Sequence, residues 1–223
     1  DGKLFMVPSR DWTSGFFPGN LWYMYEWTGD EFWKEKAIKF TNFIEKEKTN
    51  AGTHDMGFKI YCSFGNGYRI LQDERYKDIM IEAAETLSTR FNPVIGCIRS
   101  WDHNTDKWVF PVIIDNMMNL EMLVWAAKKP QGQLWWVDAS IQHALTSDRE
   151  LVRDDASTYH LVMFDQRNGD VITKGTHQGQ SDSSTWSRGQ GWAVYGFTTM
   201  YRDTGDIRML DAARRVADYF LEY

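Results

Sequence analysis

The chain has few cysteines and no stretch of apolar residues long enough to cross a membrane. Its two cysteines, Cys62 and Cys97, lack a CxxC spacing, which argues against a zinc site or a disulfide framework. A membrane-spanning helix needs about 20 apolar residues, and no run approaches that length. The sequence contains no basic stripe and no P-loop, GxGxxG, HExxH or GxSxG motif. We therefore expect no cofactor, no metal, no nucleic-acid partner and no membrane association.

Aromatic residues, by contrast, are abundant. Among the 223 residues, 43% are hydrophobic and 15% are aromatic, including 11 tryptophans. Trp is rarely buried completely but packs well on flat apolar surfaces such as the faces of sugars. Large helix interfaces are the alternative explanation, and we expect roughly half of the tryptophans to serve them. The net charge of -6 means that an anionic ligand needs a local positive site rather than a global field.

One unit recurs along the chain: an amphipathic helix, a short polar turn and a second amphipathic helix. Two of its turns share the sequence Thr-Gly-Asp, at 28–30 and 204–206, where the Asp is suited to capping the next helix. The other two turns are expected near Gln72-Asp73 and at 130–132. The four copies span residues 19–47, 58–91, 116–145 and 191–223.

The helices within a unit differ in their apolar patterns. Each second helix carries apolar residues that recur at helical spacing, as in Ile79, Ile81, Ala84 and Leu87. Each first helix is apolar on more than one face, as a helix covered on both sides would be. Inner and outer helices of this kind predict an all-α toroid of helical hairpins. The long connections 92–111, with strand-like pieces, and 157–187 are expected to carry function.

Three segments contain candidate chemistry. Asp55 and Asp115 each lie at the start of a strongly apolar inner helix, where an Asp can be a simple N-cap. Inner helices of a toroid begin on one face, so the two carboxylates could look into one pocket, where their pKa values would be pushed apart. In the third segment, 179–192, Arg188 can bind a carboxylate bidentately between Trp186 and Trp192. His160 and His177 are weaker signals.

These segments together resemble the unsaturated glucuronyl hydrolases of glycoside hydrolase family 88. The matching pieces are WTSGFFPGNLWYMYEWTGD, HDMGF, IDNMMNL, the Tyr159-His160 pair and QGQSDSSTWSRGQGW, in the family's order. The resemblance implies an (α/α)6 barrel, incomplete in this chain. Residues 1–223 would form a single catalytic domain that lacks the first helix and the C-terminal hairpins, and we expect the chain to be part of a longer protein.

The resemblance also implies a reaction. The substrate is an oligosaccharide made by a polysaccharide lyase, whose terminal uronic acid has a C4=C5 double bond. Asp115 donates a proton to C4 and accepts one from the water that adds at C5, and Asp55 tunes Asp115. The substrate-binding residues implied by the resemblance are Trp12, Trp101, His160, Gln178, Trp186, Arg188 and Trp192.

Two alternatives stay open at this point: the related unsaturated rhamnogalacturonyl specificity, and a carbohydrate-binding toroid without catalysis. The glycan that supplies the uronate, a glycosaminoglycan or an exopolysaccharide, is also open, as is the oligomeric state. We expect a soluble bacterial protein of the cytoplasm or periplasm.

Overall fold

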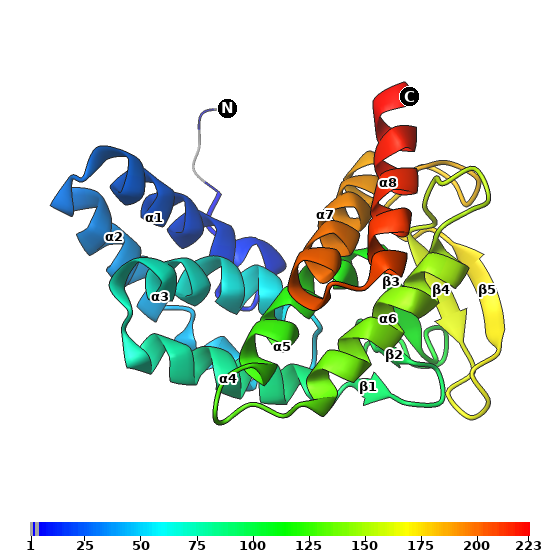
Figure 1. Ribbon diagram of the computed structural model, residues 1–223, viewed down its shortest axis with the longest axis horizontal. Helices are drawn as coiled ribbons and strands as arrows, with labels where there is room; N and C mark the ends of the chain where they lie inside the picture. Colours follow the sequence, from blue (N-terminus) through cyan, green and yellow to red (C-terminus); the bar gives the residue numbers. More distant parts are fainter. Residues whose placement is uncertain (1, 3–4) are drawn as a thin grey trace. The chain divides into compact units, whose positions relative to one another are not determined.

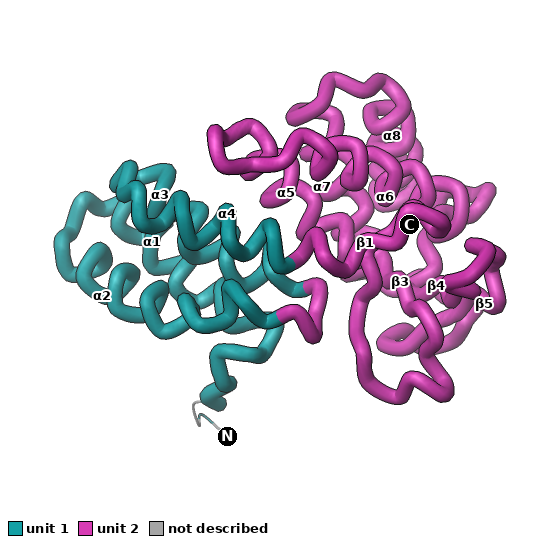
Figure 2. The backbone as a smooth tube through the Cα atoms, turned by 90° about the horizontal axis from the view of Figure 1, so that it is seen from below, with its two compact units in different colours: residues 1–50, 55–86 teal, residues 51–54, 87–223 magenta. Residues whose placement is uncertain are grey.

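The computed structural model describes residue 2 and residues 5–223, most of them in helices (Figure 1). The chain forms two compact units, distinguished in Figure 2. Unit 1 comprises the described residues up to 50 together with residues 55–86, and unit 2 comprises residues 51–54 and 87–223. Each unit contains two helical hairpins, and unit 2 also contains the strands.

Unit 1 is helical throughout its regular structure. The helix α1 packs against α2, and the π-helix η3 continues into α3 before the chain turns into α4. The turn into α4 is made by Gln72, whose φ of 54° is left-handed, and by Asp73, as predicted. The elements are η1 (Trp12–Gly15), α1 (Phe16–Thr28), α2 (Glu31–Asn42), η2 (Glu45–Thr49), η3 (Gly57–Gly65), α3 (Asn66–Leu71) and α4 (Glu74–Ser88).

The two Thr-Gly-Asp turns join their helices as the sequence predicts. In the first, Gly29 ends α1 with a φ of 69°, a left-handed conformation that costs glycine little. The Asp30 side chain then accepts a hydrogen bond from the Phe32 backbone N–H at 2.9 Å and caps α2. Gly205 and Asp206 repeat this arrangement between α7 and α8.

Unit 2 combines two hairpins with two small sheets. The hairpins pair α5 with α6 and α7 with α8, and α7 also packs along η4. The helices are η4 (Ile114–Asn119), α5 (Leu120–Ala127), α6 (Trp135–Leu151), α7 (Ser187–Thr204) and α8 (Ile207–Glu222). The strands are β1 (Phe91–Asn92), β2 (Cys97–Ile98), β3 (Pro111–Ile113), β4 (Leu161–Phe164) and β5 (Val171–Gly175).

The strands occupy the two long connections between hairpins. Strands β1, β2 and β3 confirm the strand-like pieces predicted near 92–111. Strands β4 and β5 were not predicted. They lie in the connection 157–187, which was expected to carry function but not to contain strands. Strand β4 pairs antiparallel with both β3 and β5, with Ile113 opposite Leu161 and Leu161 opposite Gly175. The sheet therefore joins the two connections that were expected to carry function.

Close backbone packing brings α7 against the segment that contains η4. A Cβ atom on Gly196 would lie 2.3 Å from the Met117 Cβ, and one on Gly189 would lie 3.0 Å from the Ile114 side chain. The short helix α5 is almost entirely buried, as predicted for an inner helix. Within the described chain, no helix has both the length and the apolar character needed to cross a membrane.

We expect Asp30→Ala to lower the free energy of unfolding by about 1 kcal/mol, because the Phe32 N–H loses its acceptor. Asp30→Asn keeps an acceptor at the same position and should stay close to the wild-type stability. Urea unfolding of the full-length protein measures both. Equal stability of the two variants would contradict the role of Asp30 as a cap.

Candidate active site

Asp115 lies in the first turn of η4, directly after β3, and its residue is only 8% exposed. The pairing of β3 with β4 places His160 beside Asp115. Beyond the Ile113–Leu161 pair, the backbone N–H of Ile114 donates to the carbonyl of His160 at 3.0 Å. The sheet thus brings Asp115 and His160 to the same end of two adjacent strands.

His160 is a neutral hydrogen-bond donor in this environment. Its Nδ1 accepts the backbone N–H groups of His177 at 2.8 Å and Gln178 at 3.2 Å, so the ring proton is on Nε2. That Nε2 lies 3.8 Å from Oδ2 of Asp115. Burial, and then the nearby His177 and Arg188, lower the pKa of His160 to about 3. Near pH 7 the imidazole of His160 is therefore uncharged, so Asp115 and His160 do not form an ion pair.

Five rings form a continuous series beside this pair, which we call the aromatic row. Trp108 meets Trp101 edge-on with ring centroids 5.7 Å apart, and Trp101 lies 5.5 Å from His177. His177 in turn stacks parallel to His160 at 6.4 Å. Trp186 closes the row, with its ring edge-on to His160 at 4.7 Å. Trp101, Trp108 and His160 are buried within the row, whereas His177 and Trp186 are at least partly exposed and present apolar surfaces of the kind that pack on sugar rings.

Arg188 lies at the Trp186 end of the row, at the second position of α7. Its guanidinium lies 4.3 Å over the Trp186 ring and donates a hydrogen bond to Oε1 of Gln178 at 2.9 Å. Trp192 lies one turn further along the same helix, so it shares a face with Arg188. Arg188 is exposed, which leaves a positive charge accessible at the start of a helix, where anions are favoured.

Arg153 holds together the two segments that lead into this site. Its guanidinium donates to the hydroxyl of Ser157 at 3.0 Å and to the carbonyl of Thr158 at 2.9 Å. It also donates to the carbonyls of Asp182 at 3.0 Å and Ser184 at 3.1 Å. The connection before β4 is therefore tied to the loop before α7, which positions the residues that follow each of them.

In unit 1, Asp55 lies just before the π-helix η3. Its carbonyl accepts the backbone N–H of Lys59 at 3.0 Å, and the Lys59 side chain is fully buried. Burial lowers the pKa of Lys59, while the charges of Asp55 and Glu47 oppose that shift. Trp12 packs edge-on against Phe58 with ring centroids 5.4 Å apart. Unit 1 therefore places Trp12 and Asp55 around one short helix of a type that often occurs at functional sites.

The predicted site residues divide between the units. Trp12 and Asp55 belong to unit 1, and the other seven predicted residues belong to unit 2. Of these seven, Trp101, His160 and Trp186 are members of the aromatic row. The prediction that Asp55 and Asp115 face one pocket stays a prediction. The N-cap residues of η3 and η4 are Met56 and Ile113, so neither Asp is itself the N-cap residue.

Several residues that shape the site had little or no signal in the sequence. His177 was a weak candidate as a lone histidine, and only its contacts with Trp101 and His160 show its place in the row. Arg153 had no signal, because a single arginine next to acidic residues is ordinary on a surface. Lys59 could have been noticed as the one charge within the apolar run FKIYC. In the part of the chain that the structure describes, no group of three or more His, Cys, Asp or Glu side chains could hold a metal ion.

Comparison with known proteins defines the class. The sequence model of Glycosyl Hydrolase Family 88 matches residues 3–222, and the chain belongs to this family. It is 50% identical over 218 residues to the unsaturated glucuronyl hydrolase of Formosa agariphila, covering 97% of this chain and 54% of that protein. It is 38% identical over 223 residues to the unsaturated glucuronyl hydrolase of Bacillus sp. strain GL1, covering 98% of this chain and 59% of that protein.

A solved relative confirms the predicted fold class. The chain is similar to the crystal structure of an unsaturated glucuronyl hydrolase specific for heparin, with a TM-score of 0.94 and 43% identity. The match covers 100% of this chain and 59% of that one. The all-α fold of the (α/α)6 barrel type is therefore established for this chain, which spans between half and two thirds of the length of the relatives it matches.

We expect His160 to make the stability of the protein depend on pH. Its pKa is about 3 in the folded state and near 6.5 when unfolded, so the unfolded state binds a proton that the folded state does not. Stability should therefore fall as pH drops below about 6.5, by up to ~1.4 kcal/mol per pH unit from this residue.

Urea unfolding of the full-length protein between pH 7.5 and 5 measures this slope. His160→Gln should reduce the slope, and His103→Gln, which changes an exposed histidine, should leave it unchanged. Identical slopes in wild type and His160→Gln would mean that His160 does not stay neutral in the folded protein.

Proposed function

We propose that the protein removes the terminal 4,5-unsaturated uronic acid from lyase-generated oligosaccharides by hydration of the C4=C5 double bond. Membership of the family and the names of the relatives support this activity. The observation that carries the chemistry is the buried Asp115, whose Oδ2 lies 3.8 Å from a neutral His160 Nε2. The relatives' names favour a glucuronyl over a rhamnogalacturonyl substrate, and both predicted carboxylates are present, which favours an enzyme over a binding protein.

In the proposed reaction, Asp115 acts first as the acid and then as the base. Its carboxyl group gives a proton to C4 of the vinyl ether, and water adds at C5 while giving its own proton to Asp115. The product is a hemiketal, which opens and releases the remaining sugar. One residue thus ends the cycle in the protonation state in which it began, as general acid/base catalysis requires.

The neutral state of His160 suits this cycle. A protonated imidazole beside Asp115 would hold the carboxylate ionised and oppose its role as a proton donor. Because two backbone N–H groups occupy Nδ1, the ring presents its Nε2 proton towards Asp115. The Nε2 atom is buried and makes no hydrogen bond to the described residues, so a substrate hydroxyl or the reacting water is a suitable partner for it.

The remaining predicted residues would hold the substrate. Arg188, with Trp192 on the same face of α7, would bind the uronate carboxylate, and Gln178 is already hydrogen-bonded to that guanidinium. Trp101 and Trp186 would pack on sugar rings. For Trp12 and Asp55 of unit 1, the family resemblance implies that they bind the sugar and its hydroxyl groups.

The substrate is an oligosaccharide that ends in the unsaturated uronate, and a glycosaminoglycan fragment is the best-supported source. A solved relative is specific for heparin. An exopolysaccharide fragment remains the alternative source. A panel of lyase-generated disaccharides, followed by loss of the absorbance of the conjugated uronate, would identify the substrate and test the activity.

Asp115→Asn should reduce turnover in the full-length enzyme by about 10²–10⁴-fold or more, because an amide cannot give and take the proton. The fold should be retained, which circular dichroism would verify. Asp106→Asn, a matched change in an exposed loop of unit 2, should keep wild-type turnover. If Asp115→Asn kept near-normal turnover, Asp115 would not be the general acid/base.

Arg188→Lys should raise KM about ten- to a hundredfold, because a lysine ammonium cannot form the planar bidentate contact with a carboxylate. Arg188→Ala should lose more, together with the preference for the acid over a carboxylate-reduced substrate. Arg214→Lys, at an exposed position of α8, is the control and should change neither parameter. Equal preference of the wild-type enzyme for charged and neutral substrates would show that Arg188 does not bind the uronate.

A further inference from the structure

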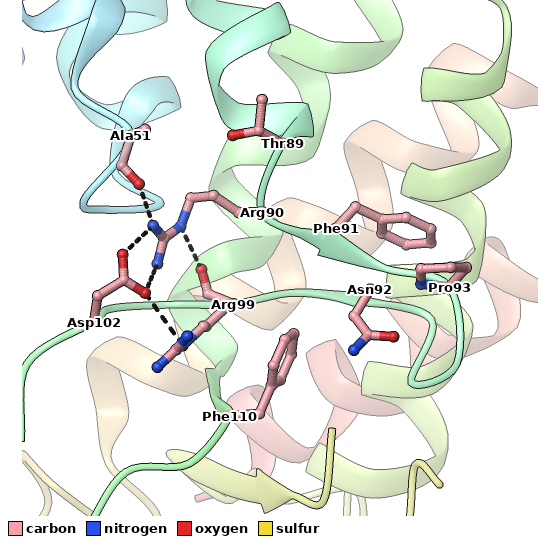
Figure 3. Close-up of a pocket in the computed structure, with 9 residues that line it drawn as sticks. All are labelled: Ala51, Thr89, Arg90, Phe91, Asn92, Pro93, Arg99, Asp102 and Phe110. Carbon is pink, nitrogen blue, oxygen red and sulfur yellow. Dashed lines mark hydrogen bonds and ion pairs between the residues drawn. The ribbon is translucent and has the colours of Figure 1, made fainter. Parts of the chain in front are cut away.

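A polar cavity lies within unit 2, at the connection between α4 and β3. It has a volume of about 460 Å³, large enough for a group of monosaccharide size, since a water molecule takes up only about 30 Å³ in the liquid. We call it the Arg99 pocket, and Figure 3 shows its lining. The residues that matter for its chemistry are Arg90, Phe91, Asn92, Arg99, Asp102 and Phe110.

Arg90 is a structural member of this pocket, with all its contacts inside the protein. Its two terminal nitrogens donate to the Asp102 carboxylate at 2.7 and 3.1 Å, and its Nε donates to the carbonyl of Arg99 at 2.8 Å. It also donates to the carbonyl of Ala51. With its side chain only 5% exposed, Arg90 neutralises Asp102 and fixes the shape of the connection.

Arg99 is the group left available for a ligand. Its Nε lies 3.2 Å from Oδ1 of Asp102, but that carboxylate is already held bidentately by Arg90. Figure 3 shows both guanidinium groups converging on the one Asp102. The terminal nitrogens of Arg99 have no hydrogen-bond acceptor among the described residues, and its side chain is 23% exposed. Two cations and one anion leave one positive charge at the pocket, in a chain whose net charge is -6.

From this arrangement we infer that the Arg99 pocket binds an acidic substituent, a sulfate ester or a carboxylate, on a sugar of the substrate beyond the cleaved uronate. A planar guanidinium with free donors suits both groups. The inference rests on the proposed function, because it assigns the pocket to the same substrate. The buried ring of Phe110 gives the pocket an apolar wall that suits the body of a sugar.

The pocket is connected to the aromatic row through the chain itself. Trp101 lies between Arg99 and Asp102 in the sequence, and its ring contacts Trp108 and His177 in the row. Trp101 itself is buried, so a sugar packed on the exposed His177 beside it would bring its substituents towards the segment that carries Arg99. The pocket would select among acidic glycans, whereas Arg188 would recognise the uronate that every substrate shares.

The test compares three substrates in the full-length enzyme, each ending in the unsaturated uronate. One is a disaccharide with no acidic group on its second sugar, one is the same disaccharide with a sulfate ester there, and one is a tetrasaccharide with an internal carboxylate. For Arg99→Gln we expect KM to rise about tenfold for the sulfated or the carboxylate substrate, with kcat unchanged. The neutral disaccharide should be unaffected. The acidic substrate whose KM rises identifies the substituent that the pocket binds.

Two further variants separate charge from structure. Arg99→Lys keeps the positive charge but loses the planar guanidinium, so its KM for the acidic substrate should lie between those of wild type and Arg99→Gln. Arg167→Gln changes an exposed ion pair of unit 2 and should match wild type. An equal change for all three substrates, or none for any, would overturn the inference.

A binding measurement keeps the two proposals distinguishable. Failure of the wild-type enzyme to consume any of the substrates would contradict the proposed function. In that case calorimetry would measure the Kd values of the same three oligosaccharides in the Asp115→Asn background, with and without Arg99→Gln. These values test whether the Arg99 pocket binds an acidic substituent. A selective loss of affinity for an acidic oligosaccharide would support it, and equal affinities would overturn it.

Discussion

The antiparallel pairing of β3 with β4 is the interaction on which the site in unit 2 depends. Both strands are buried along their whole length, so the register that places Ile113 opposite Leu161 is strongly determined. A slip of one residue would turn every side chain of a strand to the opposite face. Because β3 leads into Asp115 and His160 leads into β4, the pairing brings together two groups that are far apart in the sequence. The hydrogen bond from Ile114 N–H to the His160 carbonyl continues the ladder to the site itself.

The supporting contacts act on the segments that flank this sheet. Gly189 allows α7 to approach η4, and a side chain there would collide with Trp186 at 2.8 Å and Ile114 at 3.0 Å. Arg153 ties the approach to β4 to the approach to α7 through backbone carbonyls. Loops that carry function are usually the mobile part of a fold, and here charged hydrogen bonds hold them to a rigid scaffold.

The buried His160 is neutral, whereas two positive charges of unit 2 are accessible. His160 stays uncharged because burial and the neighbouring cation both disfavour protonation. The accessible guanidinium of Arg188 and the net positive charge of the Arg99 pocket lie on separate segments. Because the chain has a net charge of -6, an acidic substrate would be attracted by these local positive charges rather than by the protein as a whole. The proposed proton-transfer group, Asp115, is thus buried, and the proposed anion-binding group, Arg188, is accessible within the same unit.

The helical hairpins and their turns were determined by the sequence itself, because capping and amphipathic spacing act between neighbouring residues. Asp30 and Asp206 cap the helices that follow them, and Gly29 and Gly205 end the preceding ones, as the repeated Thr-Gly-Asp motif predicts. The same local signals identified Arg188 at the start of a helix and Asp115 before an apolar one. The family resemblance, carried by five short segments, predicted the fold class that the solved relative confirms.

Only the tertiary structure decided what surrounds those residues. The pairing of β3 with β4, the place of His177 in the aromatic row and the contacts of Arg153 all join segments that are distant in the sequence. The neutral state of His160 is likewise a consequence of burial among those segments. No local pattern encodes such contacts, because their free energy is gained only when the connections pack on the helical scaffold and water is excluded.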